Sequence, residues 1–184
     1  MRHNSALLII DMINEFNFEG SENLLHHIRP MMKPLLELKK QAKEQGLPVI
    51  YVNDNYGLWR EDVGDLIKLA EEGIGKEIIE QFKPEKDDFF IIKPKHSGFY
   101  GTQLETLLND LKVDNLILTG IAGDFCVMFT AFDAYMREYG LWVPSDCIAS
   151  ETAQDNDNAL QLMHRSMSVH IAKSTEGNIE EVFK

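Results

Sequence analysis

Cysteine is scarce in this sequence, and long hydrophobic runs are absent. The two cysteines, Cys126 and Cys147, stand outside any CxxC pattern and near no histidine-rich tract, so no structural zinc site is expected. The first apolar run, residues 6–10, is too short for a signal peptide or a membrane span. We therefore expect a cytoplasmic protein whose thiols stay free.

Basic residues are also in short supply. Lysine and arginine total 18 against 30 aspartates and glutamates, which gives a net charge of −12 at pH 7. An acidic surface argues against nucleic acid or an anionic membrane as the main partner, and the lysines form no cluster. The 184 residues suffice for one domain with a substantial core, and no linker, repeat or low-complexity tract divides them. A single domain, 1–184, is expected.

Short apolar runs alternate with segments of helical periodicity along the chain. Strands are predicted at residues 6–10, 47–53, 88–93, 115–120, 141–147 and 168–172, and helices at 24–45, 62–82, 102–112, 126–139 and 158–167. Pro30 and Pro34 predict that the regular part of the first helix begins near Met31. The alternation predicts an α/β fold with a mostly parallel sheet.

Three chemically useful residues stand at the ends of predicted strands. Asp11 follows the first strand, Lys93 ends the third, and Cys126 follows the fourth after a short loop. In open parallel sheets, ligands bind beyond the carboxyl ends of the strands. A lysine ammonium and a helix N-terminus lower the pKa of a thiol, and a carboxylate can accept its proton. We therefore expect Cys126 to be a nucleophile with a lowered pKa.

The loop before Cys126 contains two glycines, Gly120 and Gly123. Glycine lets the backbone approach a substrate closely. The backbone N–H groups of Ala122 and Cys126 are then placed to bind a developing oxyanion.

Each of these three residues also has an ordinary interpretation. Asp11 can cap the following segment, as aspartate often does at a strand end. Lys93 can be an exposed lysine like its neighbour Lys95. Cys126 can be a buried core cysteine, which is how we interpret Cys147.

Four stretches in order along the chain carry a family resemblance: LLIIDMINEF, IIKPKHSGFYGT, LILTGIAGDFCV and FTAFDA. With them the chain resembles the isochorismatase-like cysteine hydrolases, which include nicotinamidases and carbamoylsarcosine amidases. The resemblance spans nearly the whole chain. It implies a three-layer α-β-α fold of Rossmann type, with a six-stranded mostly parallel sheet flanked by helices.

The resemblance also implies the site. It implies a catalytic triad of Asp11, Lys93 and Cys126, and a cis peptide bond between Ile121 and Ala122. It implies thiolate attack, a tetrahedral intermediate, loss of ammonia or an amine and hydrolysis of a thioester, with a small-molecule substrate and no cofactor. It further implies a homo-oligomer, a dimer or larger.

Position in the family motifs places four further residues at the substrate pocket, although core packing is the alternative for each aromatic one. They are Asn14, Phe16, Trp59 and Phe125.

The sequence departs from the family at two places. In nicotinamidases an aspartate after the second strand is followed two residues later by a metal-binding histidine. Here the residue two positions after Asp54 is Tyr56, and no histidine lies between Asp54 and His96. No metal site is therefore expected, and Asp54 is interpreted as a hydrogen-bond partner or a remnant of that site. Gly123 replaces a common threonine, which predicts a larger pocket or a looser oxyanion loop.

The leading hypothesis is a cysteine hydrolase that cleaves a carbon–nitrogen bond of a small amide. One alternative is isochorismatase-type vinyl-ether hydrolysis, with Asp11 as the acid and Cys126 idle. Another is a non-catalytic binding module that has kept the fold. The loops at 54–87 and 148–157 are expected to set specificity.

Overall fold

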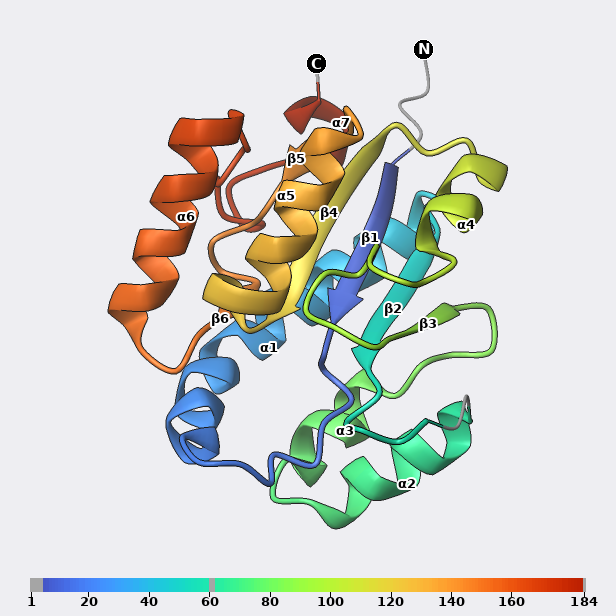
Figure 1. Ribbon diagram of the computed structural model, residues 1–184. Helices are drawn as coiled ribbons and strands as arrows, with labels where there is room; N and C mark the ends of the chain where they lie inside the picture. Colours follow the sequence, from blue (N-terminus) through green and yellow to red (C-terminus); the bar gives the residue numbers. More distant parts are fainter. Residues whose placement is uncertain (1–4, 60–61, 184) are drawn as a thin grey trace.

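A computed structural model describes residues 5–59 and 62–183. Its strands form one parallel sheet in the order β3-β2-β1-β4-β5, and β6 pairs with the end of β4 (Figure 1). The strands are β1 (Ser5–Ile10), β2 (Val49–Asp54), β3 (Phe89–Lys93), β4 (Asn115–Ile121), β5 (Gly140–Trp142) and β6 (Ile148–Ala149). The predicted α/β fold with a six-stranded parallel sheet is confirmed.

Helices cover both faces of the sheet. They are α1 (Ser21–Glu44), α2 (Val63–Glu72), α3 (Lys76–Phe82), α4 (Leu104–Asp110), α5 (Met128–Met136), α6 (Ala153–Met167) and α7 (Ile179–Val182), with a π-helical turn, η1 (Gly123–Val127), before α5. Within the described parts of the chain, no helix is long and apolar enough to cross a membrane.

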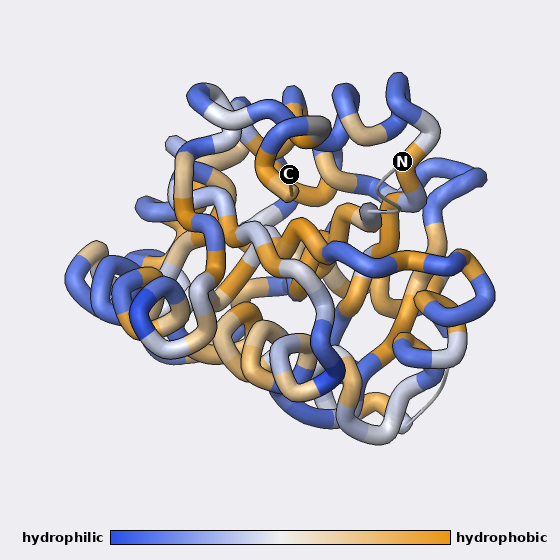
Figure 2. The backbone as a smooth tube through the Cα atoms, turned by 90° about the horizontal axis from the view of Figure 1, so that it is seen from above, coloured by the Kyte–Doolittle hydropathy of each residue, from blue (hydrophilic) through white to orange (hydrophobic). Residues whose placement is uncertain are grey.

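The central strand β1 separates two hydrophobic clusters. Leu7 and Ile9 join the cluster that contains the buried sides of α1 and α3. Leu8 and Ile10 join the cluster that contains α4, α5 and α6. Successive side chains of a strand point to opposite faces, so both faces of a buried strand must be apolar. Hydrophobic residues are accordingly concentrated in the middle of the molecule, and hydrophilic residues lie mostly at its periphery (Figure 2).

The prediction that two prolines delay the first regular helix was wrong. α1 begins at Ser21 rather than Met31 and contains both Pro30 and Pro34. A proline inside a helix costs about 3 kcal/mol, whereas burying one large aliphatic side chain contributes about 1.5–3 kcal/mol. Ile28 and other apolar residues before the prolines are buried, so tertiary packing offsets the cost.

The segment predicted as one helical patch, 62–82, divides into α2 and α3 around two glycines. A Cβ atom on Gly73 would lie 2.1 Å from the carbonyl oxygen of Glu15, and one on Gly75 would lie 2.1 Å from the ring of Phe16. The loop after β1 therefore packs directly on the break between the two helices, which no periodicity in the sequence indicates.

The last two predicted strands are shorter than expected. The segment 141–147 contributes only the end of β5, because Pro144 interrupts it, and β6 follows as a separate strand. The segment 168–172 forms only an isolated bridge between His170 and Trp142.

The last long helix starts earlier than its apolar periodicity predicts. α6 begins at Ala153 because the side chain of Thr152 accepts a hydrogen bond from the backbone N–H of Asp155. The sequence did not predict α7.

Candidate active site

The parallel register brings the ends of four strands to one edge of the sheet. Ile10, the last residue of β1, is level with Gly120 of β4. Asp54, the last residue of β2, is level with Lys93, the last residue of β3. Asp11 follows Ile10 directly, and its carboxylate contacts the backbone N–H of Asp54 at the end of β2 and the ammonium of Lys93 at the end of β3.

Lys93 is at the centre of the resulting cluster. Its side chain is fully buried, unlike that of the exposed Lys95. The Nζ atom of Lys93 lies 2.9 Å from Asp11 Oδ2, 3.4 Å from Asp54 Oδ2 and 3.4 Å from Cys126 Sγ. The structure therefore brings together the three residues predicted from the strand ends, and adds Asp54 to them.

Asp11 is held by its backbone and by the neighbouring strand. Its φ angle is 52°, in the left-handed region that few non-glycine residues adopt. Its Oδ1 accepts a hydrogen bond of 2.6 Å from the backbone N–H of Asp54. The next turn is fixed by Asn53, whose side chain bonds both the N–H and the C=O of Ile13. Strained backbone that is held this firmly is common at functional sites.

Cys126 lies in the π-helical turn η1, two residues before α5. Its carbonyl oxygen accepts a hydrogen bond from the Thr130 hydroxyl, and the same hydroxyl accepts one from the Gly98 backbone N–H. Nδ1 of His96 is 3.9 Å from the Cys126 sulfur. The turn that carries the thiol is thus joined to the loop after Lys93. Single π-helical turns are frequent at functional sites.

The expectation that the pKa of Cys126 is lowered was wrong. Burial raises the pKa of Cys126, the negative charge of Asp11 raises it further, and the ammonium of Lys93 opposes both only in part. Burial also raises the pKa of Asp11, although Lys93 opposes this shift. The carboxylates around Lys93 outweigh burial and raise its pKa to about 12. The raised pKa of Cys126 thus favours a neutral thiol, which lies beside the contact between the Lys93 ammonium and the Asp11 carboxylate.

The loop between β4 and Cys126 packs closely against the end of β1. Gly120 has a φ angle of 102°, and a Cβ atom there would lie 2.1 Å from the carbonyl oxygen of Ile10. The peptide bond between Ile121 and Ala122 is cis. Ala122 and Cys126 both line the cavity described next.

Gly123 neither enlarges the cavity nor loosens the loop. A Cβ atom on Gly123 would lie 2.3 Å from Asn156 Oδ1 and 2.9 Å from Ile148 Cδ1. The following N–H, that of Asp124, donates to the Ser150 hydroxyl. The volume that a threonine side chain would use is taken by the start of α6, so the loop is tightly packed here.

A cavity of about 460 Å³ opens onto Asp11 and Cys126. Of the four residues predicted to line the pocket, Asn14 and Phe125 do so. Phe16 does not, because its ring is buried in the core against the break between α2 and α3. Trp59 does not line the cavity either, and this residue is 82% exposed.

The side chains at the end of β2 do not fit the metal site of nicotinamidases. Tyr56 stands where the metal-binding histidine is expected, and its hydroxyl lies 3.5 Å from Asn53 Nδ2. Burial raises the pKa of Tyr56 well above its ordinary value, so the phenol stays neutral. In the part of the chain that the structure describes, no group of three or more His, Cys, Asp or Glu side chains is placed to hold a metal ion.

The isochorismatase domain matches residues 5–175 of the chain. The chain belongs to the isochorismatase family. An uncharacterized isochorismatase family protein of Bacillus subtilis, YaaI, is 46% identical over 176 residues, which cover 96% of each chain. The ureidoacrylate amidohydrolase RutB of Serratia proteamaculans is 36% identical over 162 residues, with 73% of this chain and 65% of that protein covered.

Solved structures agree with this family assignment. The N-carbamoylsarcosine amidase of Thermoplasma acidophilum superimposes with a TM-score of 0.74 at 27% identity, covering 95% of this chain and 99% of that one. The isochorismatase family therefore includes relatives of this chain that are named as amidases and amidohydrolases.

Several residues of this family member's cavity were not predicted from the sequence. Phe18, Asp124, Glu151 and Asp155 all line it. Glu151 and Asp155 come from the segment 148–157, which the sequence indicated only as a specificity loop. Glu151 and Asp155 lie far from Cys126 in sequence and in none of the four family motifs, so nothing in the sequence indicated that these two residues line the cavity.

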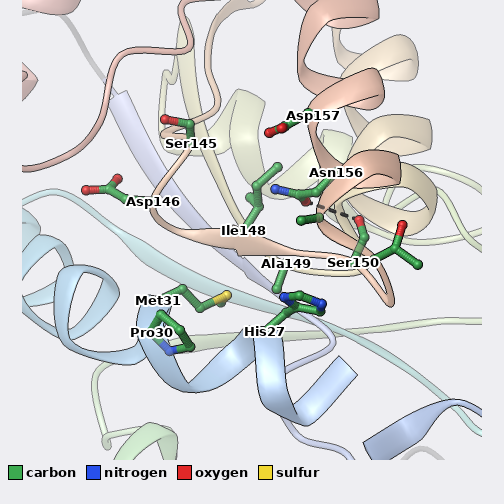
Figure 3. A pocket seen from close by; sticks show the side chains of 12 residues that line it. His27, Pro30, Met31, Ser145, Asp146, Ile148, Ala149, Ser150, Asn156 and Asp157 are labelled. Carbon is green, nitrogen blue, oxygen red and sulfur yellow. Dashed lines mark hydrogen bonds between the residues drawn. The ribbon is translucent and has the colours of Figure 1, made fainter. Parts of the chain in front are cut away.

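The same segment also lines a second, smaller cavity of about 250 Å³ on its other side. Figure 3 shows Ser150, Asn156 and Asp157 facing this cavity, opposite His27 of α1, with Ser150 bonded to Asn156. Residues 150–157 thus contribute to both cavities, with Glu151 and Asp155 at the first and Ser150, Asn156 and Asp157 at the second.

Proposed function

We propose that this chain is a cysteine hydrolase that cleaves the carbon–nitrogen bond of a small amide through a thioester on Cys126. The observation that carries the proposal is the position of Lys93, whose ammonium contacts both Asp11 and Cys126 within 3.4 Å. The names of the amidase and amidohydrolase relatives support the same reaction type.

The first half of the reaction moves one proton inside the cluster. Asp11 accepts the thiol proton while Sγ of Cys126 bonds to the carbonyl carbon and the C=O electron pair moves onto oxygen. The net charge does not change, because the negative charge that the Asp11 carboxylate loses appears on the oxyanion of the tetrahedral intermediate. The backbone N–H groups of Ala122 and Cys126 bind the oxyanion. The C–N bond then breaks as Asp11 returns its proton to the leaving nitrogen.

The second half repeats the same steps with water. Asp11 takes a proton from a water molecule, whose oxygen attacks the thioester carbon. The C–S bond breaks, the acid product leaves, and the proton on Asp11 returns to the sulfur of Cys126. A raised pKa suits Asp11 to this work, because a base that must also release its proton functions best with a pKa closer to neutrality.

The geometry supports vinyl-ether hydrolysis less well. That reaction needs Asp11 as an acid but gives no role to the contact between Lys93 and Cys126. A protein that only binds a ligand would likewise not need the buried Asp11–Lys93 ion pair beside the thiol of Cys126.

A screen of small amides and one vinyl ether tests the proposal. Release of ammonia or amine is measured for the wild type, for Cys126→Ser and for Cys147→Ser as the matched control. The proposal expects amide hydrolysis by the wild type and Cys147→Ser, and none by Cys126→Ser. Vinyl-ether hydrolysis that survives in Cys126→Ser, without any amide hydrolysis, would establish the alternative reaction instead.

A further inference from the structure

Carboxylates dominate the polar lining of the candidate active-site cavity. Asp11, Asp54, Asp124, Glu151 and Asp155 line it, and none of the described lining residues is a lysine, arginine or histidine. The described lining of the cavity therefore carries more negative than positive charge, which attracts a cation at short range.

The five carboxylates fall into two sets. Asp11 and Asp54 both contact the ammonium of Lys93, which offsets part of their charge. Asp124, Glu151 and Asp155 take part in no ion pair among the residues that the structure describes. The inner pair, Asp11 and Asp54, thus contacts Lys93, whereas the outer three carboxylates contact no Lys, Arg or His side chain in the described parts of the chain.

The outer carboxylates come from two segments that pack against each other, since the backbone N–H of Asp124 donates to the Ser150 hydroxyl. Asp124 is in η1, two residues before Cys126, whereas Glu151 lies in the loop before α6 and Asp155 in the first turn of that helix. The carboxylate of Glu151 lies against Gly20, where a Cβ atom would come within 2.5 Å of Oε2. Glycine at this left-handed position, with a φ angle of 88°, leaves the space that the carboxylate occupies.

We infer that the cavity selects small amides that carry a positive charge, such as a protonated amine, at the end remote from the reacting carbonyl. This inference rests on the proposed function. The amide carbonyl lies against Cys126, and the cationic end lies toward Asp124, Glu151 and Asp155. Apolar side chains, among them Phe18, contact the chain between the two ends. A volume of about 460 Å³ is sufficient for a molecule of this size.

The expected selectivity follows from the charges. A unit charge about 4 Å from a carboxylate gains about 1 kcal/mol even at the dielectric constant of water, which is about a fivefold effect on binding. A cationic amide is therefore favoured over its neutral isostere, and an anionic one is disfavoured. A carboxylate such as ureidoacrylate, for which one relative is named, belongs to the disfavoured class.

Three chain-matched amides test the inference: 4-aminobutanamide as the cation, pentanamide as its neutral isostere and succinamate as the anion. We expect kcat/KM to fall in that order, with at least a fivefold step between cation and neutral amide at low salt. Glu151→Gln, Asp124→Asn and Asp155→Asn should each reduce that step several-fold, and added salt should reduce it as well.

Asp157→Asn is the matched control. Asp157 lies two residues after Asp155 on α6 but faces the second cavity (Figure 3). It should leave the preference unchanged. Equal kcat/KM for the three amides, or a preference that all four variants leave intact, would overturn the inference while the proposed function stands.

A binding measurement separates the inference from the proposed function. If the wild type hydrolyses none of the three amides, calorimetry with Cys126→Ala compares their affinities directly. Tighter binding of 4-aminobutanamide than of pentanamide, weakened by Glu151→Gln but not by Asp157→Asn, supports the charge preference without hydrolysis. Equal affinities would contradict it.

Discussion

The ammonium of Lys93 lies 3.4 Å from the sulfur of Cys126, and the pKa of the thiol is nevertheless raised. Burial of the thiol and the charge of Asp11 together outweigh the attraction of one ammonium. In the reaction that we propose, the nucleophile is therefore generated during turnover, by transfer of the thiol proton to Asp11.

This arrangement predicts an unusual response of Cys126 to alkylation. Because its pKa is raised, iodoacetamide should react with Cys126 at pH 7.5 more slowly than with free cysteine, whose pKa is about 8.5. Asp11→Asn removes the neighbouring negative charge and leaves Lys93 in place, so alkylation should become faster while amide hydrolysis falls. Alkylation rates against pH, followed by peptide mass spectrometry, check both signs. A wild-type thiol with an apparent pKa below 8.5 would contradict the account.

The acid side of the pH–activity profile should report Asp11. The base form of Asp11 is the ionised one, and burial raises its pKa. We therefore expect kcat/KM to rise with pH through a pKa above the ordinary aspartate value of 3.8. In Asp11→Asn, the kcat/KM of the remaining activity should no longer rise with pH over this range. An acid limb that persists unchanged in Asp11→Asn would assign the titration to another group.

Lys93→Met should lower the stability of the fold as well as its activity. Removing one partner of a buried ion pair leaves an uncompensated charge, which typically costs about 3–5 kcal/mol. Urea unfolding measures the loss, and Lys95→Met is the matched control, since Lys95 is exposed. Protonation of Asp11 relieves the unpaired charge.

The pH dependence of the Lys93→Met variant has a definite sign. Without the ammonium, the folded-state pKa of Asp11 lies further above its unfolded value. A carboxyl group with a raised folded-state pKa loses stability as pH rises through the unfolded and then the folded value. Lys93→Met should therefore be closest to the wild type at low pH and fall behind it toward neutrality. A deficit that is independent of pH would contradict the ion-pair explanation.

Much of this arrangement was predictable from the sequence. The carboxyl ends of parallel strands meet at one edge, so Asp11, Lys93 and the loop before Cys126 were expected there, and the structure places them together. The sign of the Cys126 pKa shift was not predictable, because it depends on burial depth and on the distance to Asp11. The positions of Phe16 and Trp59 likewise depend on loop packing that leaves no periodic signal.

Gly123→Thr should disturb the oxyanion loop instead of merely filling space. The added atoms would collide with Asn156 and Ile148, and overpacking of this kind typically costs about 1–3 kcal/mol. Thermal unfolding and kcat measure the two effects. Gly123→Thr combined with Asn156→Ala should recover part of the loss, because the nearest contact is removed. A single variant with wild-type stability and activity would show that the loop has more room than the contacts indicate.

The oligomer expected from the family resemblance remains a prediction. A row of exposed apolar side chains on η1 and α5 allows it to be tested by mutation. Phe125, Phe129, Phe132 and Met136 follow one another at helical spacing and are between 37% and 77% exposed. Contiguous exposed apolar side chains often mark an interaction surface. Light scattering after size exclusion should show a dimer or larger for the wild type and a smaller species for Phe132→Glu. A wild-type monomer would contradict the prediction.

The most direct test of the covalent mechanism is the mass of Cys126 during turnover. A rapid acid quench of the enzyme with a hydrolysed amide, followed by peptide mass spectrometry, should show the acyl group of that amide on Cys126 and none on Cys147. Hydroxylamine should remove the group, as it does from a thioester. Continued release of ammonia with Cys126 unmodified at every quench time, and undiminished in Cys126→Ser, would contradict the account.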